Sequence, residues 1–188
     1  MTHRFMLAAA VLAALAATPA QADDVLDALD AARKAYQAGD YGEAKQQLDT
    51  ASQLIGQKNA ESFAALLPNA LSGWTAEKTD VNSIGTHMLG ASTASRRYTS
   101  TRGDHVEVQI TGDSALLAPM AAMFANSQFA GFMGKVTRIG NQRAIINSDG
   151  DVYIVVDSKY LVTVTGNGSA SDKLAYAQAV DVAKLAKM

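Results

Sequence analysis

The stretch VTRIGNQRAIINSDGDVYIVVDSKYLVTVT, residues 136–165, decides the fold of this 188-residue chain. Apolar and polar residues alternate in four short runs, which are separated by Gly140-Asn141, Asp149-Gly150 and Asp157-Ser158-Lys159. Such alternation is typical of half-buried strands, and Gly-Asn or Asp-Gly pairs between the runs are strong hairpin signals. We therefore predict strands over 136–139, 143–147, 152–157 and 160–165, the last three forming an antiparallel meander.

Upstream of this stretch the sequence predicts further strands. His105–Ile110 alternates without a break and indicates another half-buried strand. The run 91–101 is rich in Ser and Thr and is extended in character, and Trp74 is expected to open the first strand. Arg96 and Arg97 are neighbours on this extended run, so their side chains should point to opposite faces of the sheet.

Two helices are predicted beside these strands. The composition of 116–132 favours a helix with Pro119 in its first turn, closed by Gly131 and Gly134. A capping box of Ser169 and Asp172 announces a terminal helix over 174–185. Since runs of strands stand apart from the helices, we expect an α+β fold, an antiparallel sheet covered by two helices. This order of elements resembles that of PsbP-like and Mog1-like sandwiches.

A helical hairpin is predicted ahead of the sheet, over residues 23–67. Apolar residues follow three-to-four spacing from Val25 to Tyr36, stop at Gly39-Asp40-Tyr41, and resume from Ala44 to Ile55. A third, shorter helical segment is expected from 60 to 67, ending at Pro68. The chain thus divides into 1–22, a helical hairpin region at 23–67, and an α+β domain at 68–188.

The spacing of small and aromatic residues in this region resembles one tetratricopeptide repeat. The residues concerned are Ala32, Gly39-Asp40-Tyr41, Ala44, Leu48 and Ala51. Gly56 stands where such a repeat usually has a proline after its second helix. A single unit cannot form a solenoid. It can either dock on its own domain or, as the resemblance implies, offer a free face to a partner protein.

Residues 1–22 read as a secretory signal peptide. His3 and Arg4 form a positive start, 5–17 an apolar run, and Ala20-Gln21-Ala22 a small-residue cleavage site. Export to the periplasm, or secretion, is therefore expected. No later run is long and apolar enough to span a bilayer.

The chain has no cysteine, which removes thiol catalysis, zinc–thiolate sites and a lipid anchor attached at cysteine. The net charge is −2, or −3 once Arg4 leaves with the signal peptide, and this argues against nucleic-acid binding.

No catalytic constellation is apparent in the sequence. His87 and His105 are the histidines outside the signal peptide, and no G-x-S-x-G motif is present. Asp149 and Asp151 flank Gly150 in a predicted turn, where aspartate is favoured by turn chemistry. We therefore expect a protein that is not an enzyme and needs no cofactor.

Two functional hypotheses remain. The first is an exported, non-catalytic accessory protein that binds an unidentified protein partner through its helical hairpin, with Tyr36, Tyr41 and Trp74 as aromatic anchors. The alternative is a periplasmic protein that binds a small ligand or Cu(I), because thioether sulfurs are soft ligands suited to Cu(I). That site would lie between helix 119–132 and the sheet, and its ligands would be Met120, Met123, Met133, His87 and Met88.

Overall fold

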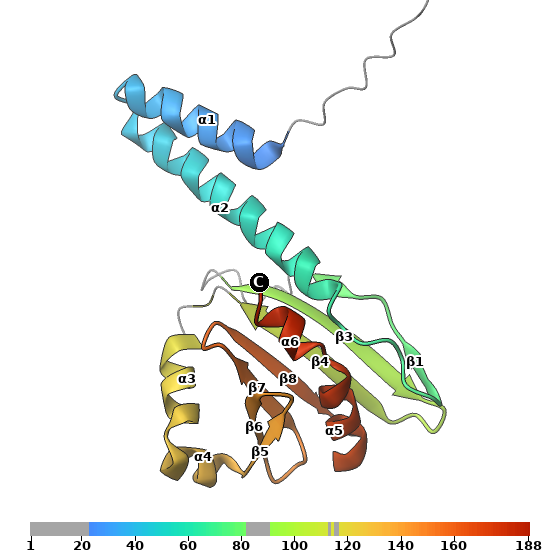
Figure 1. Ribbon diagram of the computed structural model, residues 1–188. Helices are drawn as coiled ribbons and strands as arrows, with labels where there is room; N and C mark the ends of the chain where they lie inside the picture. The colour runs from blue at the N-terminus through green and yellow to red at the C-terminus, as the bar shows by residue number, and fades with distance from the viewer. Residues whose placement is uncertain (1–22, 82–90, 113, 115–116) are drawn as a thin grey trace, which may run out of the picture.

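The computed structural model describes residues 23–81, 91–112, 114 and 117–188. The predicted signal peptide and the candidate ligands His87 and Met88 lie outside the described residues. The fold is α+β, as predicted: a helical hairpin precedes an antiparallel sheet with helices packed on it (Figure 1).

The hairpin consists of α1 (Asp24–Gln37) and α2 (Tyr41–Ala64). Gly39, at φ 80°, makes the turn, and the Asp40 side chain caps α2 by accepting a hydrogen bond from the Glu43 amide. The prediction of a separate helical segment at 60–67 was wrong, because most of these residues belong to α2. Residues 41–64 form a single helix, because burial of Ala60 and Phe63, the latter against the sheet, outweighs the low helix propensity of Gly56.

In the described ranges, eight strands form one antiparallel sheet in the order β1-β3-β4-β8-β7-β6-β5, with β2 paired to β3. The strands are β1 (Trp74–Ala76), β2 (Asp80–Val81), β3 (Ser92–Ser100), β4 (His105–Gly112), β5 (Lys135–Ile139), β6 (Gln142–Ile146), β7 (Val152–Val156) and β8 (Tyr160–Gly166). The predicted meander is confirmed by the register, in which Ile145 pairs with Tyr153 and Tyr153 with Thr163.

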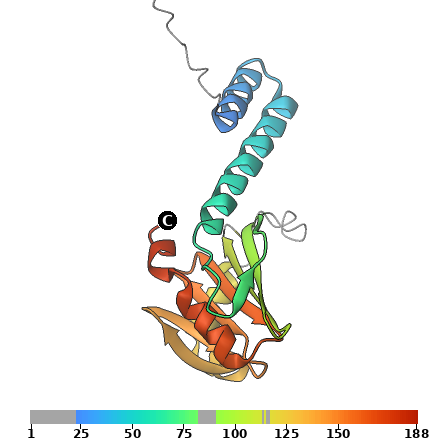
Figure 2. The same ribbon diagram turned by 90° about the vertical axis from the view of Figure 1, so that its right-hand side faces the viewer.

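Each face of the sheet is covered by its own helices. On one face, α5 (Ala170–Ala179), α6 (Val182–Leu185) and the end of α2 enclose the main core (Figure 2). On the other face, α3 (Leu117–Ala125) and α4 (Ser127–Met133) cover β6 and β7 through Phe124, Ala130 and Ile145.

Both predicted sheet-covering helices are divided in two. The first breaks at Asn126, whose side chain caps α4 by accepting from the Gln128 amide. The terminal helix begins at Ala170, four residues earlier than predicted, behind the expected Ser169–Asp172 capping box. It breaks at Val180, which adopts an extended conformation, and Asp181 caps the short α6.

Candidate functional site

The hairpin is held together by small side chains. Buried alanines line the contact between the two helices, namely Ala28 and Ala32 of α1 and Ala44 and Ala51 of α2. Because alanine projects little beyond the backbone, the helices can approach closely. The close approach leaves the larger apolar side chains outside the contact.

Six large apolar side chains of the hairpin are exposed, by 40 to 68% of their surface; they are Leu26, Leu29, Tyr36, Tyr41, Leu48 and Ile55, and we call this set the hairpin stripe. Tyr41, Leu48 and Ile55 are seven residues apart, so they fall along one side of α2, and Leu29 and Tyr36 do the same on α1. The Tyr36 and Tyr41 rings are in contact, with centroids 5.7 Å apart, and this joins the two rows on one side of the hairpin.

The hairpin projects from the body of the molecule. Figures 1 and 2 show that α1 packs along the first part of α2 and that the sheet meets only the far end of α2. Buried contacts of Phe63, Leu66 and Leu67 anchor that end to the main core. The α1 row, Tyr41 and Leu48 therefore lie away from the sheet, where a large ligand can reach them, whereas Ile55 adjoins Gly56, which approaches Ser92 of β3.

Two of the three predicted aromatic anchors come together, and one does not. Tyr36 and Tyr41 form the outer end of the hairpin stripe. Trp74 lies on β1, half-buried, and its ring meets Tyr176 of α5 edge-on at 5.4 Å. Sequence reasoning placed the leucines of the stripe in the hairpin's apolar pattern but did not separate them from the buried alanines.

Hydrogen bonds attach the connector between α2 and β1 to the face of the sheet that carries the main core. The Tyr98 hydroxyl donates to the Pro68 carbonyl at 2.6 Å, and the Leu71 amide donates to the Tyr176 hydroxyl at 3.2 Å. Burial raises the pKa of Tyr98 to about 12. Burial also raises the pKa of Tyr176. These contacts fix the base of the hairpin on the sheet.

The two neighbouring arginines point to opposite faces, as predicted. Arg96 lies on the main-core face, where its guanidinium donates to Thr79 at 2.7 Å and to the Pro68 carbonyl at 3.3 Å. Arg97 pairs on the other face with Glu107 at 3.2 Å. Both guanidinium groups are thus occupied within the fold.

A buried ion pair ties α5 to the turn between β6 and β7. The Lys173 side chain is 3% exposed, and its Nζ lies 2.7 Å from Asp151 Oδ1, 2.7 Å from the Asp149 carbonyl and 3.0 Å from the Gly166 carbonyl. From the sequence, Asp151 was predicted to act only in the turn. Its amide does bond the Asn147 side chain, at 2.8 Å, but its carboxylate also neutralises the buried lysine.

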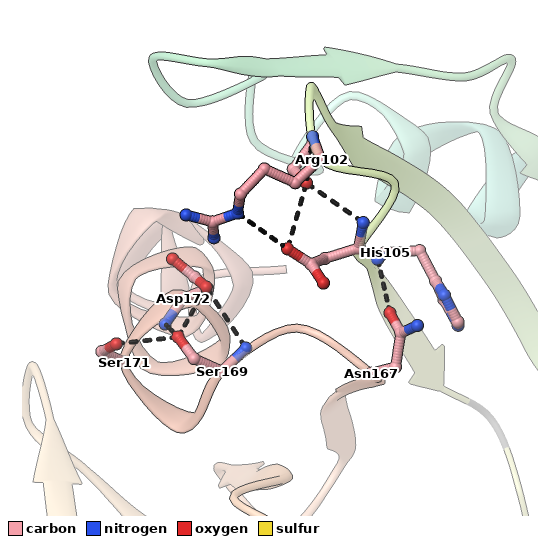
Figure 3. A network of polar contacts seen from close by, with 8 residues as sticks. Arg102, His105, Asn167, Ser169, Ser171 and Asp172 are labelled. Atoms are coloured by element: carbon pink, nitrogen blue, oxygen red, sulfur yellow. Dashed lines mark hydrogen bonds and ion pairs between the residues drawn. The ribbon is translucent and has the colours of Figure 1, made fainter.

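Polar side chains gather at one end of β4 (Figure 3). The Asp104 carboxylate accepts from Ser100 and Arg102, and Ser169 bonds Asp172 within the capping box. The backbone amide of His105 donates to Asn167 at 2.6 Å, while its imidazole points away from Ser169. These bonds connect loops and cap a helix, and they do not aim the imidazole at a hydroxyl nucleophile as general-base catalysis requires.

The methionines proposed as copper ligands have different surroundings. Met120 packs against the cluster of Phe124, Ala130 and Ile145, which fills the space between α3–α4 and the sheet. Met123 and Met133 are 46% and 38% exposed. Among the residues that the structure describes, no three His, Asp or Glu side chains come close enough to share a metal ion.

The fold and the hairpin stripe define a class: an α+β protein that carries a projecting helical hairpin with an exposed apolar side. Comparisons with protein-family models, curated proteins and solved structures give no match for this chain. Within the described ranges, none of the helices has both the length and the apolar character needed to cross a membrane.

Proposed function

We propose that this chain is an exported, non-catalytic accessory protein that binds a partner protein through its helical hairpin. One observation carries the proposal: six large apolar side chains are exposed together on one side of a hairpin that projects from the sheet. Contiguous apolar patches of several hundred Å² are uncommon on monomeric proteins and mark interaction sites.

The residue types in the hairpin stripe support a protein as the ligand. Tyr36 and Tyr41 are 66% and 68% exposed and in contact with each other. Tyrosine pairs offer a large apolar area and a polar tip, and they are enriched where interfaces gain most of their free energy. The neighbouring leucines extend the patch along both helices, which suits a partner that offers an elongated apolar surface.

The way the hairpin is mounted supports the same proposal. A strap of hydrogen bonds from Tyr98 and Tyr176 fixes the connector, so α2 leaves the sheet in a defined direction. A surface held in place before binding loses less conformational entropy when a partner docks. The sheet domain would then serve as the scaffold. The expected signal peptide supports the proposed localisation, which is the periplasm or the outside of the cell.

The test compares the native protein with a variant in which Tyr36→Ser and Leu48→Ser remove one large apolar side chain of the stripe from each helix. Because both side chains are largely exposed, the thermal unfolding midpoint should change little. Extracts of the host's export compartment are separated by size under native conditions. We expect the native chain in a complex larger than one chain and the variant shifted to smaller size. Equal elution of the two proteins, with both folded, would refute the proposal.

A further inference from the structure

The hairpin stripe has a symmetry that bears on the nature of its partner. Tyr41, Leu48 and Ile55 are evenly spaced, with Leu48 in the middle. At about 1.5 Å per residue, the outer two lie roughly 21 Å apart along α2. A two-fold axis through Leu48 would lay this row on a second copy of itself, with Leu48 against Leu48 and Tyr41 against Ile55 at either end.

The row on α1 fits the same axis. Tyr36 contacts Tyr41, so one step of seven residues along each helix puts Leu29 at the level of Leu48. The axis therefore passes beside the Leu29–Leu48 pair. Tyr41 of one copy lies opposite Ile55 of the other, and Leu26, three residues from Leu29, lies between the axis and that end. Two hairpins joined in this way form an antiparallel four-helix bundle, which is a common packing for helices with such stripes.

Charge selects the antiparallel arrangement over the parallel one. The first turns of α1 carry four aspartates and no cation, at positions 23, 24, 27 and 30. The end near the turn carries Arg33, Lys34 and Lys45 as well as Asp40 and Glu43. Within one hairpin, Arg33 pairs with Asp30 at 3.0 Å and Lys58 of α2 lies 3.9 Å from Asp23. With these cations counted, the end near the sheet still carries a net negative charge and the named residues near the turn a small positive one. An antiparallel pair therefore sets opposite net charges together, whereas a parallel pair sets two negative ends together.

The area agrees with a dimer. If a large side chain offers about 200 Å², the exposed fractions of the stripe amount to roughly 600 Å² of apolar surface. A stable interface buries about 800 Å² on each partner, part of it a polar rim. The stripe alone therefore supplies most of such an area, and a polar rim would supply the rest.

We infer that the partner of the hairpin is a second copy of this chain, joined through the hairpin stripe in a two-fold antiparallel bundle centred on Leu48. This inference rests on the proposed function and specifies it. Each hairpin would cover the apolar side of the other, and the two sheet domains would stand at opposite ends of the bundle.

The chain has no cysteine, so single introduced cysteines report the register without background. The full chain is expressed with Leu48→Cys, Tyr41→Cys, Ile55→Cys or Gln46→Cys, and disulfides are formed under mild oxidation. Gln46 is an exposed residue of α2 on the side away from the stripe and serves as the control. We expect rapid covalent dimers of Leu48→Cys, rapid mixed dimers of Tyr41→Cys with Ile55→Cys, and slow dimers of Gln46→Cys.

Sedimentation of the cysteine-free chain gives an independent readout. The dimer dissociation constant should rise roughly 10- to 100-fold in Leu48→Ser, because each dimer loses two central apolar contacts. Cross-linking of Gln46→Cys at the rate of Leu48→Cys, or a monomer at every concentration, would overturn the inference. If the monomeric chain still enters a larger complex in host extract through the stripe, the proposed function stands and only the identity of the partner fails. If the stripe variants change neither result, both fail.

Discussion

Lys173→Met tests the buried ion pair that holds α5 to the sheet. The change keeps the apolar stem of the side chain but removes an ammonium group that makes three contacts of 2.7 to 3.0 Å. It leaves the Asp151 carboxylate without its cation and two carbonyl groups without their donor. Asp151 keeps its contact with the Asn147 amide, at 3.2 Å, and its side chain is 17% exposed.

The magnitude follows from these surroundings. Removing one partner of a buried ion pair lowers the free energy of unfolding by about 3–5 kcal/mol, because the other charge remains buried without a counter-charge. Partial exposure of Asp151 lets water replace some of the lost contact, so we expect a loss of about 3 kcal/mol. For a chain of this size, that loss lowers the melting temperature by roughly 6–12 °C.

Urea unfolding followed by far-UV circular dichroism measures the effect. The midpoint should fall while the slope with urea stays unchanged, since the amount of surface exposed on unfolding is the same. Lys187→Met, at an exposed lysine near the C-terminus, is the matched control and should change stability by less than about 0.5 kcal/mol. Combining Lys173→Met with Asp151→Asn should cost less than the two single changes added together. A Lys173→Met protein as stable as the control would refute the reasoning.

Three further changes test other parts of the fold. Burial raises the pKa of Tyr98 to about 12, so between about pH 10 and pH 12 this tyrosine ionises only in the unfolded state. Its contribution to the free energy of unfolding should therefore be fully present below pH 10 and should decline toward pH 12. Tyr98→Phe should lessen that decline in urea titrations. Gly134→Ala should lower the free energy of unfolding by about 3 kcal/mol or more, since at φ 153° a Cβ would collide with the Ile146 carbonyl oxygen. At Gly131 a Cβ would meet open space, so Gly131→Ala is the control and should not destabilise the protein. Ser169→Ala should cost about 1 kcal/mol in thermal melts through loss of the capping box, and an unchanged melt would argue against that cap.

The strands were predictable because their signals are local. Alternation in 152–165 sets which side chains face the core, and Val152, Ile154, Val162 and Val164 are all fully buried. The Asp-Gly turn works because Gly150 adopts φ 78°, which glycine tolerates without strain. The order of these strands and the face that each side chain takes followed from the sequence pattern, whereas the pairing register came from the structure.

The candidate site was only half predictable. Periodicity groups Leu29 and Leu48 with Ala32 and Ala51, because all four follow a helical spacing. Which of them is buried depends on how closely the helices approach and on what else covers them. The structure buries the alanines and exposes the leucines.

The burial of Lys173 could not be predicted from the sequence either. A lysine in an amphipathic helix is normally solvated. Its partners here are Asp151, Asp149 and Gly166, which come from two turns and are brought together only by the folded sheet.

Whether the hairpin stripe binds a protein can be determined by cross-linking from it inside the host. A photoreactive side chain is placed at Leu48, which is 52% exposed, and in a second strain at Gln46 on the opposite side of α2. Irradiation of intact cells should give a discrete covalent adduct of protein size from position 48 and none from position 46. No adduct at position 48, or the same adducts from both positions, would contradict the account.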